Sequence, residues 1–112
     1  MEALTYFKNR RAEFAANHFN RKEALSFCKR LYKLGANQVD IDILDPNEED
    51  GPVEETYADA LTVSLPKKLS KSRRLDIVVA ILNEHPDEIS TTSHFMQDVN
   101  WGKDTSFYLW WD

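Results

Sequence analysis

The stretch from Asn20 to Gly35 constrains the fold most, because it contains the start, the buried face and the end of one helix. Asn20 can accept a hydrogen bond from the backbone of Glu23, whose side chain can reach back, as in a capping box. Gly35 can adopt the left-handed conformation that ends a helix. Apolar residues recur between these ends at the three-and-four spacing of a buried face. They are Ala24, Leu25, Cys28, Leu31 and Tyr32.

Alternation of apolar and other residues predicts strands around this helix. Residues 39–44, 58–65 and 107–111 each place apolar side chains on one side of an extended chain. A short strand over residues 12–19 is expected to precede the helix. Residues 45–56 contain six acidic residues and no basic ones, and we expect them to form the loop of a long hairpin.

A second helix is predicted after Pro66, which ends the preceding strand. Ser70 or Ser72 can cap this helix, and its pattern stops between Asn83 and Pro86. β-branched residues are frequent in the run, which also fits a buried strand, but its length favours a helix. The positions expected to face the core are Leu75, Val78, Val79 and Leu82, with Ile77, Ala80 and Ile81 widening the buried face.

The order strand, helix, strand, strand, helix, strand matches the ferredoxin-like plan. We therefore expect an α+β fold, a two-layer sandwich in which an antiparallel sheet carries two helices on one face. A chain of 112 residues is too short for two independent cores, so residues 1–112 are expected to form one domain. Residues 1–11 are expected to form a short helix or an N-terminal arm.

Composition favours a cytoplasmic protein. No apolar run reaches the roughly 18 to 20 residues of a membrane span, and the N-terminal residues lack the apolar stretch of a secretory signal. Cys28 is the single cysteine, which fits a reducing compartment and excludes an internal disulfide. The net charge of -5 disfavours binding to nucleic acid.

Three short motifs carry a resemblance to known proteins: LYKLGA at residues 31–36, YADALTVSLP at 57–66 and LWWD at 109–112. With its Gly-Ala after a helix, its Tyr-Ala-Asp strand ending in Leu-Pro and its closing Trp-Trp-Asp, the chain resembles a group of small bacterial proteins without an established activity. The resemblance covers roughly residues 20 to 112. It implies a shared fold and supplies no catalytic residues.

The case for catalysis is weak. His94 and Asp98 lie four residues apart, and together with Asp59 or Asp112 they form a candidate metal or ligand site, although no established metal-binding spacing supports it. Cys28 lies in the apolar stripe of the first helix, where a thiol behaves as a small buried hydrophobe. Three glycines leave no glycine-rich phosphate loop. We therefore lean against an enzyme and expect no cofactor.

Five cations crowd the start of the second predicted helix, where the helix macrodipole disfavours positive charge. They are Lys67, Lys68, Lys71, Arg73 and Arg74. A solvated charge run is the simpler interpretation, and a site for a phosphate or an acidic partner is the alternative. The acidic loop is expected at the far end of the strands, so the molecule would be electrically bipolar.

The last strand points to a binding surface. If its alternate residues face the helices, Tyr108 and Trp110 lie on the open side of the sheet, together with Asp40 and Asp42. Aromatic rings among polar groups are typical of an interaction hot spot. The alternative is that the N-terminal arm or a second copy of the chain covers this side.

The leading functional hypothesis is a non-enzymatic protein-binding module, of the inhibitor or immunity type, that uses this aromatic face and the acidic loop to bind a basic partner. The loop carboxylates assigned to this role are Glu48, Glu49, Asp50, Glu54 and Glu55. The rival hypothesis is a small ligand-binding or metal-dependent enzyme domain that uses Asp59, His94 and Asp98. Self-association through Trp110, giving a homodimer, is compatible with the first hypothesis.

Overall fold

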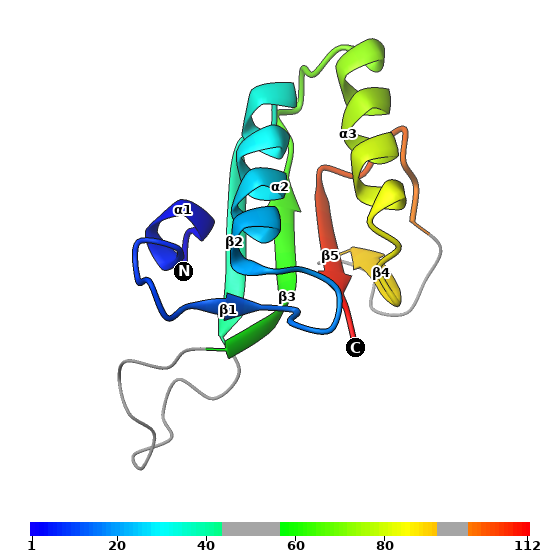
Figure 1. Ribbon diagram of the computed structural model, residues 1–112. Helices are drawn as coiled ribbons and strands as arrows, with labels where there is room; N and C mark the ends of the chain where they lie inside the picture. Colours follow the sequence, from blue (N-terminus) through cyan, green and yellow to red (C-terminus); the bar gives the residue numbers. More distant parts are fainter. Residues whose placement is uncertain (44–56, 92–98) are drawn as a thin grey trace.

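The computed structural model of the protein describes residues 1–43, 57–91 and 99–112 (Figure 1). These residues form three helices and a five-stranded sheet, which confirms the predicted α+β class. In chain order the elements are α1 (Ala3–Tyr6), β1 (Glu13–Phe14), α2 (Arg21–Leu34), β2 (Gln38–Ile43), β3 (Tyr57–Ser64), α3 (Lys71–Asn83), β4 (Glu88–Thr91) and β5 (Ser106–Trp110). Figure 1 shows α2 and α3 on the same side of the sheet.

The strand β3 lies in the middle of the sheet. It pairs antiparallel with β2 on one edge and with β5 on the other. β5 also pairs antiparallel with β4, so β3 and β4 run in the same direction on either side of β5. Because α3 joins β3 to β4, these elements form a split βαβ unit.

The strand β1 makes the sheet mixed. It pairs parallel with the first two residues of β3, so the prediction of a purely antiparallel sheet is wrong, and the ferredoxin-like arrangement is not confirmed. The predicted strand over residues 12–19 shortens to two residues because Ala15 adopts a left-handed conformation with φ of 45°. The amides of His18 and Phe19 both donate to the Ala15 carbonyl, which turns the chain toward α2.

The predicted caps of α2 are confirmed. The Asn20 side chain accepts a hydrogen bond from the Glu23 amide at 2.7 Å, and the Asn20 amide donates to the Glu23 carboxylate at 3.0 Å. Gly35 ends the helix with φ of 118°, and a Cβ at this position would lie 2.9 Å from a methyl carbon of Leu69. The helix therefore begins and ends where its sequence requires.

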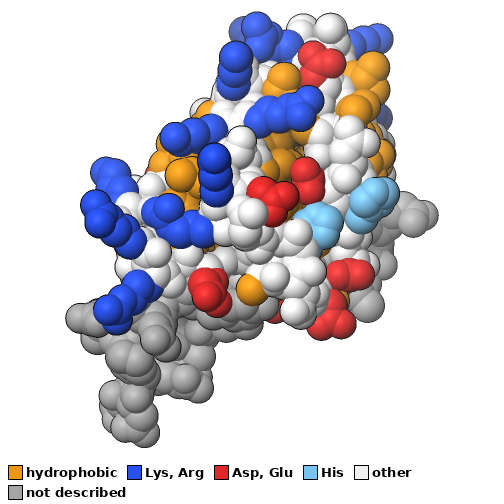
Figure 2. Space-filling model, in the orientation of Figure 1, with side chains coloured by type: hydrophobic (Ala, Val, Ile, Leu, Met, Phe, Trp, Pro, Cys, Tyr) orange, Lys and Arg blue, Asp and Glu red, His pale blue; other side chains and the backbone are white. Residues whose placement is uncertain are grey.

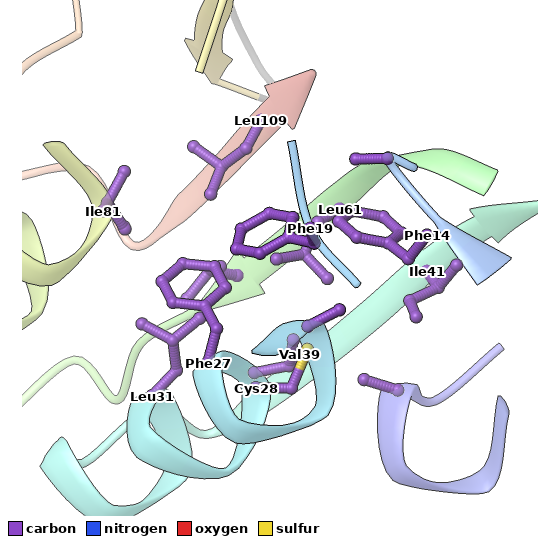
Figure 3. Packing of buried hydrophobic residues seen from close by; sticks show 14 of the residues in the cluster. Phe14, Phe19, Phe27, Cys28, Leu31, Val39, Ile41, Leu61, Ile81 and Leu109 are labelled. Carbon is purple, nitrogen blue, oxygen red and sulfur yellow. The ribbon is translucent and has the colours of Figure 1, made fainter. Parts of the chain in front are cut away.

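The core lies between the sheet and the two long helices (Figure 3). Alternate residues of the three central strands are fully buried there, as the sequence pattern predicted. They are Val39 and Ile41 on β2, Leu61 and Val63 on β3, and Phe107 and Leu109 on β5. At one end of this layer, Trp111 packs against the rings of Phe14, Phe19 and Phe27.

The buried face of α3 differs from the prediction. Leu75, Val79 and Leu82 were expected in the core, but they are 61%, 46% and 46% exposed. The residues that α3 buries are Ile77, Val78, Ala80 and Ile81. The run is apolar nearly all round, so its periodicity could not specify which side faces the sheet.

Candidate functional site on the open face of the sheet

The side of the sheet opposite α2 and α3, called the open face below, carries the candidate site. Its side chains alternate along each strand with those that face the core. The Cα register aligns them in rows across β2, β3, β5 and β4. One row is Asp40, Thr62, Tyr108 and Ser90, and the next is Asp42, Ala60, Trp110 and Glu88. Two aromatic rings on β5 thus lie between carboxylates on β2 and β4.

The two rings on β5 are half-buried. Ala60, the register partner of Trp110 on β3, and Ser90, the partner of Tyr108 on β4, are each 2% exposed. The small neighbours of the rings therefore contribute almost nothing to the surface. Tyr108 and Trp110 present the main accessible aromatic area of these rows.

The charged side chains of the two rows have one sign. Asp40, Asp42 and Glu88 lie in these rows, whereas β2, β3, β4 and β5 contain no lysine or arginine within their described bounds. The amide of Gln38 donates to the Asp40 carboxylate at 2.9 Å. Burial raises the pKa of Tyr108 above its ordinary value of 10.0, and the charges of Asp42, Asp59 and Glu88 raise it further.

Replacing Asp42 with asparagine is expected to lower the pKa of Tyr108, because one of the charges that disfavour the phenolate is removed. Titration of the Tyr108 ring carbons by NMR measures this shift. The matched control is Asp76→Asn, which removes a carboxylate from the exposed surface of α3. Equal Tyr108 pKa values in the wild type and in Asp42→Asn would contradict a negative open face.

The same shift sets the pH dependence of stability. Because the folded-state pKa of Tyr108 is raised, its contribution to stability is complete below the unfolded pKa of about 10. The contribution is lost as the pH rises through the folded-state pKa. Stability is therefore expected to fall in the alkaline range, and Asp42→Asn should make that fall smaller, because the folded-state pKa of Tyr108 then lies closer to its unfolded value.

The N-terminal arm is held at the outer edge of β2. The backbones of Met1 and Ile41 exchange two hydrogen bonds, at 2.7 and 3.1 Å. The Tyr32 hydroxyl on α2 donates to the Glu2 carboxylate at 2.7 Å. Burial alone would raise the pKa of Glu2, but hydrogen bonds from Leu4, Tyr32 and Thr5 outweigh it and lower the pKa. These contacts run to α2 and the β2 edge, which favours an arm that leaves the open face uncovered.

The predicted basic patch lies on the side of the molecule that carries the helices, where Figure 2 shows many lysine and arginine side chains. Two of its five members have structural partners. Arg74 donates to the carbonyls of Asp104 and Trp101 at 2.6 and 2.9 Å, and Arg73 donates to the carbonyl of Lys33 at 3.3 Å. The remaining members, Lys67, Lys68 and Lys71, are exposed. Arg73 also lines a groove of about 590 Å³ with Lys29, Arg30, Lys33 and Leu34.

The rival metal or ligand site lies only partly within the described residues. His94 and Asp98 fall outside them, as do the five carboxylates assigned to the acidic loop. Asp59 is half-buried, and one of its carboxylate oxygens has no hydrogen-bond partner within the described part of the chain. Across residues 1–43, 57–91 and 99–112, no group of three or more His, Cys, Asp or Glu side chains is arranged to hold a metal ion.

The two other side chains with reactive groups are Cys28 and His18, and both pack among neighbouring side chains. Cys28 is buried on α2 as predicted, and burial together with the charge of Glu2 raises the pKa of its thiol to about 12. Such a thiol is a poor nucleophile at neutral pH. His18 contacts the Glu84 carboxylate at 2.9 Å and stacks on Trp111. Both groups therefore belong to the packing around the core.

Sequence reasoning missed two members of the rows, Glu88 and Ser90, because β4 was not predicted. The only signal was a four-residue alternation in which Ile89 and Thr91 are the less polar partners. So short a pattern does not distinguish a strand from a loop.

Comparison of the chain with protein-family models, with curated proteins and with solved structures finds no match. Among the described residues, no helix is both long enough and apolar enough to cross a membrane. The open face is therefore interpreted from its own geometry and charge.

Proposed function

We propose that the protein is a non-catalytic binding module, of the inhibitor or immunity type, that recognises a basic segment of a partner protein through the open face. One observation carries the proposal: Tyr108 and Trp110 lie between the carboxylates of Asp40, Asp42 and Glu88 on a sheet without lysine or arginine. Aromatic rings flanked by charges of one sign favour a partner that carries the opposite charge.

An arginine side chain suits this arrangement. A cation over the face of a tryptophan or tyrosine ring gains about 0.5 to 2 kcal/mol, and a carboxylate adds a charge-assisted hydrogen bond. Glu88 is the register partner of Trp110, so their Cα atoms lie about 5 Å apart. Asp42 lies two strands away on the other side, at about 10 Å. A guanidinium group over Trp110 is thus within reach of a carboxylate.

The acidic residues 45–56 lie outside the described residues, and their part in the proposal rests on the sequence. They connect β2 to β3, and β2 carries Asp40 and Asp42 of the two rows. Six negative charges in the segment that joins these strands increase the rate at which a positively charged partner arrives.

Neutralising the five assigned loop carboxylates is expected to slow association with an arginine-rich peptide by about tenfold at low salt and to have little effect at about 0.5 M salt, because steering is screened there. The variant carries Glu48→Gln, Glu49→Gln, Asp50→Asn, Glu54→Gln and Glu55→Gln. Stopped-flow tryptophan fluorescence measures the rate, and Asp76→Asn on α3 is the control. An unchanged association rate at low salt removes the loop from the mechanism.

A further inference from the structure

An apolar stripe on the outer surface of α3 has no partner within the described residues. Leu75, Val79 and Leu82 lie four and three residues apart, which places them on one side of the helix. They are the large hydrophobic side chains, apart from Met1, that are most exposed in the described part of the chain. Figure 2 shows hydrophobic side chains at the surface along α3. An exposed apolar helix stripe is typical of an interaction surface.

The two ends of α3 carry side chains of opposite charge, with cations at the start and carboxylates at the end. The cations Lys67, Lys68 and Lys71 lie at or before its first turn, which has no acidic residue. Glu84 and Asp87 lie at or after its last turn, which has no basic residue. Both ends oppose the helix macrodipole, because positive charge is favoured at the C-terminus of a helix and negative charge at its N-terminus.

We propose that the stripe is a self-association surface on which α3 of a second copy packs antiparallel. The stripe is nearly symmetric about Val79, so a twofold axis at Val79 brings Leu75 of each copy next to Leu82 of the other. The same axis places the basic end of one helix beside the acidic end of its partner. The opposed macrodipoles then compensate each other, and the unfavourable charge pattern of the single helix becomes favourable.

The size of the stripe sets the strength of this dimer. A helix of 13 residues is about 20 Å long, and a single helix pair buries less than the roughly 800 Å² per partner of a stable interface. We expect a dissociation constant between about 10 and 500 µM that increases with salt concentration. Because α3 and the open face lie on opposite sides of the sheet (Figure 1), this dimer leaves both open faces accessible.

Sedimentation equilibrium at low and high salt tests the self-association. Val79→Glu brings two carboxylates together at the twofold axis and is expected to weaken the dimer by about tenfold or more. Ala16→Glu adds the same charge to the exposed turn between β1 and α2 and should leave the dimer unchanged. Circular dichroism verifies that both variants are folded. A wild type that stays monomeric at about 1 mM, or a dimer that persists in Val79→Glu, overturns the proposal.

Disulfide cross-linking tests the antiparallel arrangement. Under a mild oxidant, Val79→Cys should cross-link to itself, and a mixture of Leu75→Cys and Leu82→Cys should give the mixed dimer. Leu75→Cys alone should cross-link little, because its two copies lie about 12 Å apart along the helix axes, beyond the reach of a disulfide. The buried Cys28 does not compete. Efficient self-cross-linking of Leu75→Cys indicates parallel helices and overturns the proposal. None of these outcomes bears on peptide binding by the open face.

Discussion

Replacing Trp111 with alanine is expected to lower the free energy of unfolding by about 3 to 5 kcal/mol. Trp111 is 1% exposed, and its ring lies 5.4 Å from that of Phe19 and 5.6 Å from that of Phe14. Its indole N–H donates to the carbonyl of Glu84 at 2.8 Å. The substitution therefore removes the centre of an aromatic cluster and leaves a partly buried carbonyl without its donor at the end of α3.

Urea denaturation measures this loss of stability. Trp111→Phe is the graded control, because it keeps most of the packing and removes the hydrogen bond, so we expect a loss of about 1 to 2 kcal/mol. A loss below about 1 kcal/mol for Trp111→Ala would show that the cluster does not stabilise this end of the core.

Replacing the neighbouring Trp110 with alanine is expected to weaken peptide binding strongly and the fold only slightly. Trp110 is half-buried on the open face, so its removal should cost the fold less than Trp111→Ala. The dissociation constant for an arginine-rich peptide is expected to rise by about tenfold or more, since an aromatic anchor beside carboxylates is typical of a hot spot. Isothermal titration calorimetry measures the change.

A control variant separates the role of the Trp110 ring from general damage. Trp110→Phe keeps an aromatic face and should retain part of the affinity. Equal affinities for wild type and Trp110→Ala would contradict a binding role for this ring.

The sequence predicted those elements whose local signals agree with their packing. The caps at Asn20 and Gly35 and the alternation in β2, β3 and β5 depend on few residues and a fixed period, and the structure confirms them. The prediction was wrong at Ala15, whose left-handed backbone has no signal in an alanine. It was also wrong for α3, where apolar residues on all sides left the buried face undetermined.

The same reasoning explains how much of the candidate site could be predicted. The alternation of side chains along each strand placed Tyr108, Trp110, Asp40 and Asp42 on one side of the sheet. The register brings them into adjacent rows. The order of the strands decides which side chains are neighbours across the sheet, and a single sequence does not specify that order. Glu88 was therefore missed as the partner of Trp110.

Chemical-shift mapping tests the central claim most directly. The ¹⁵N-labelled protein is titrated with an arginine-rich peptide, and the shifts of all amides and of the Trp110 indole are followed. We predict the largest changes at the two rows of the open face, with small changes along α2. Changes concentrated on α2 and α3, or no change at peptide concentrations of about 1 mM, would contradict the claim that the open face binds a basic partner.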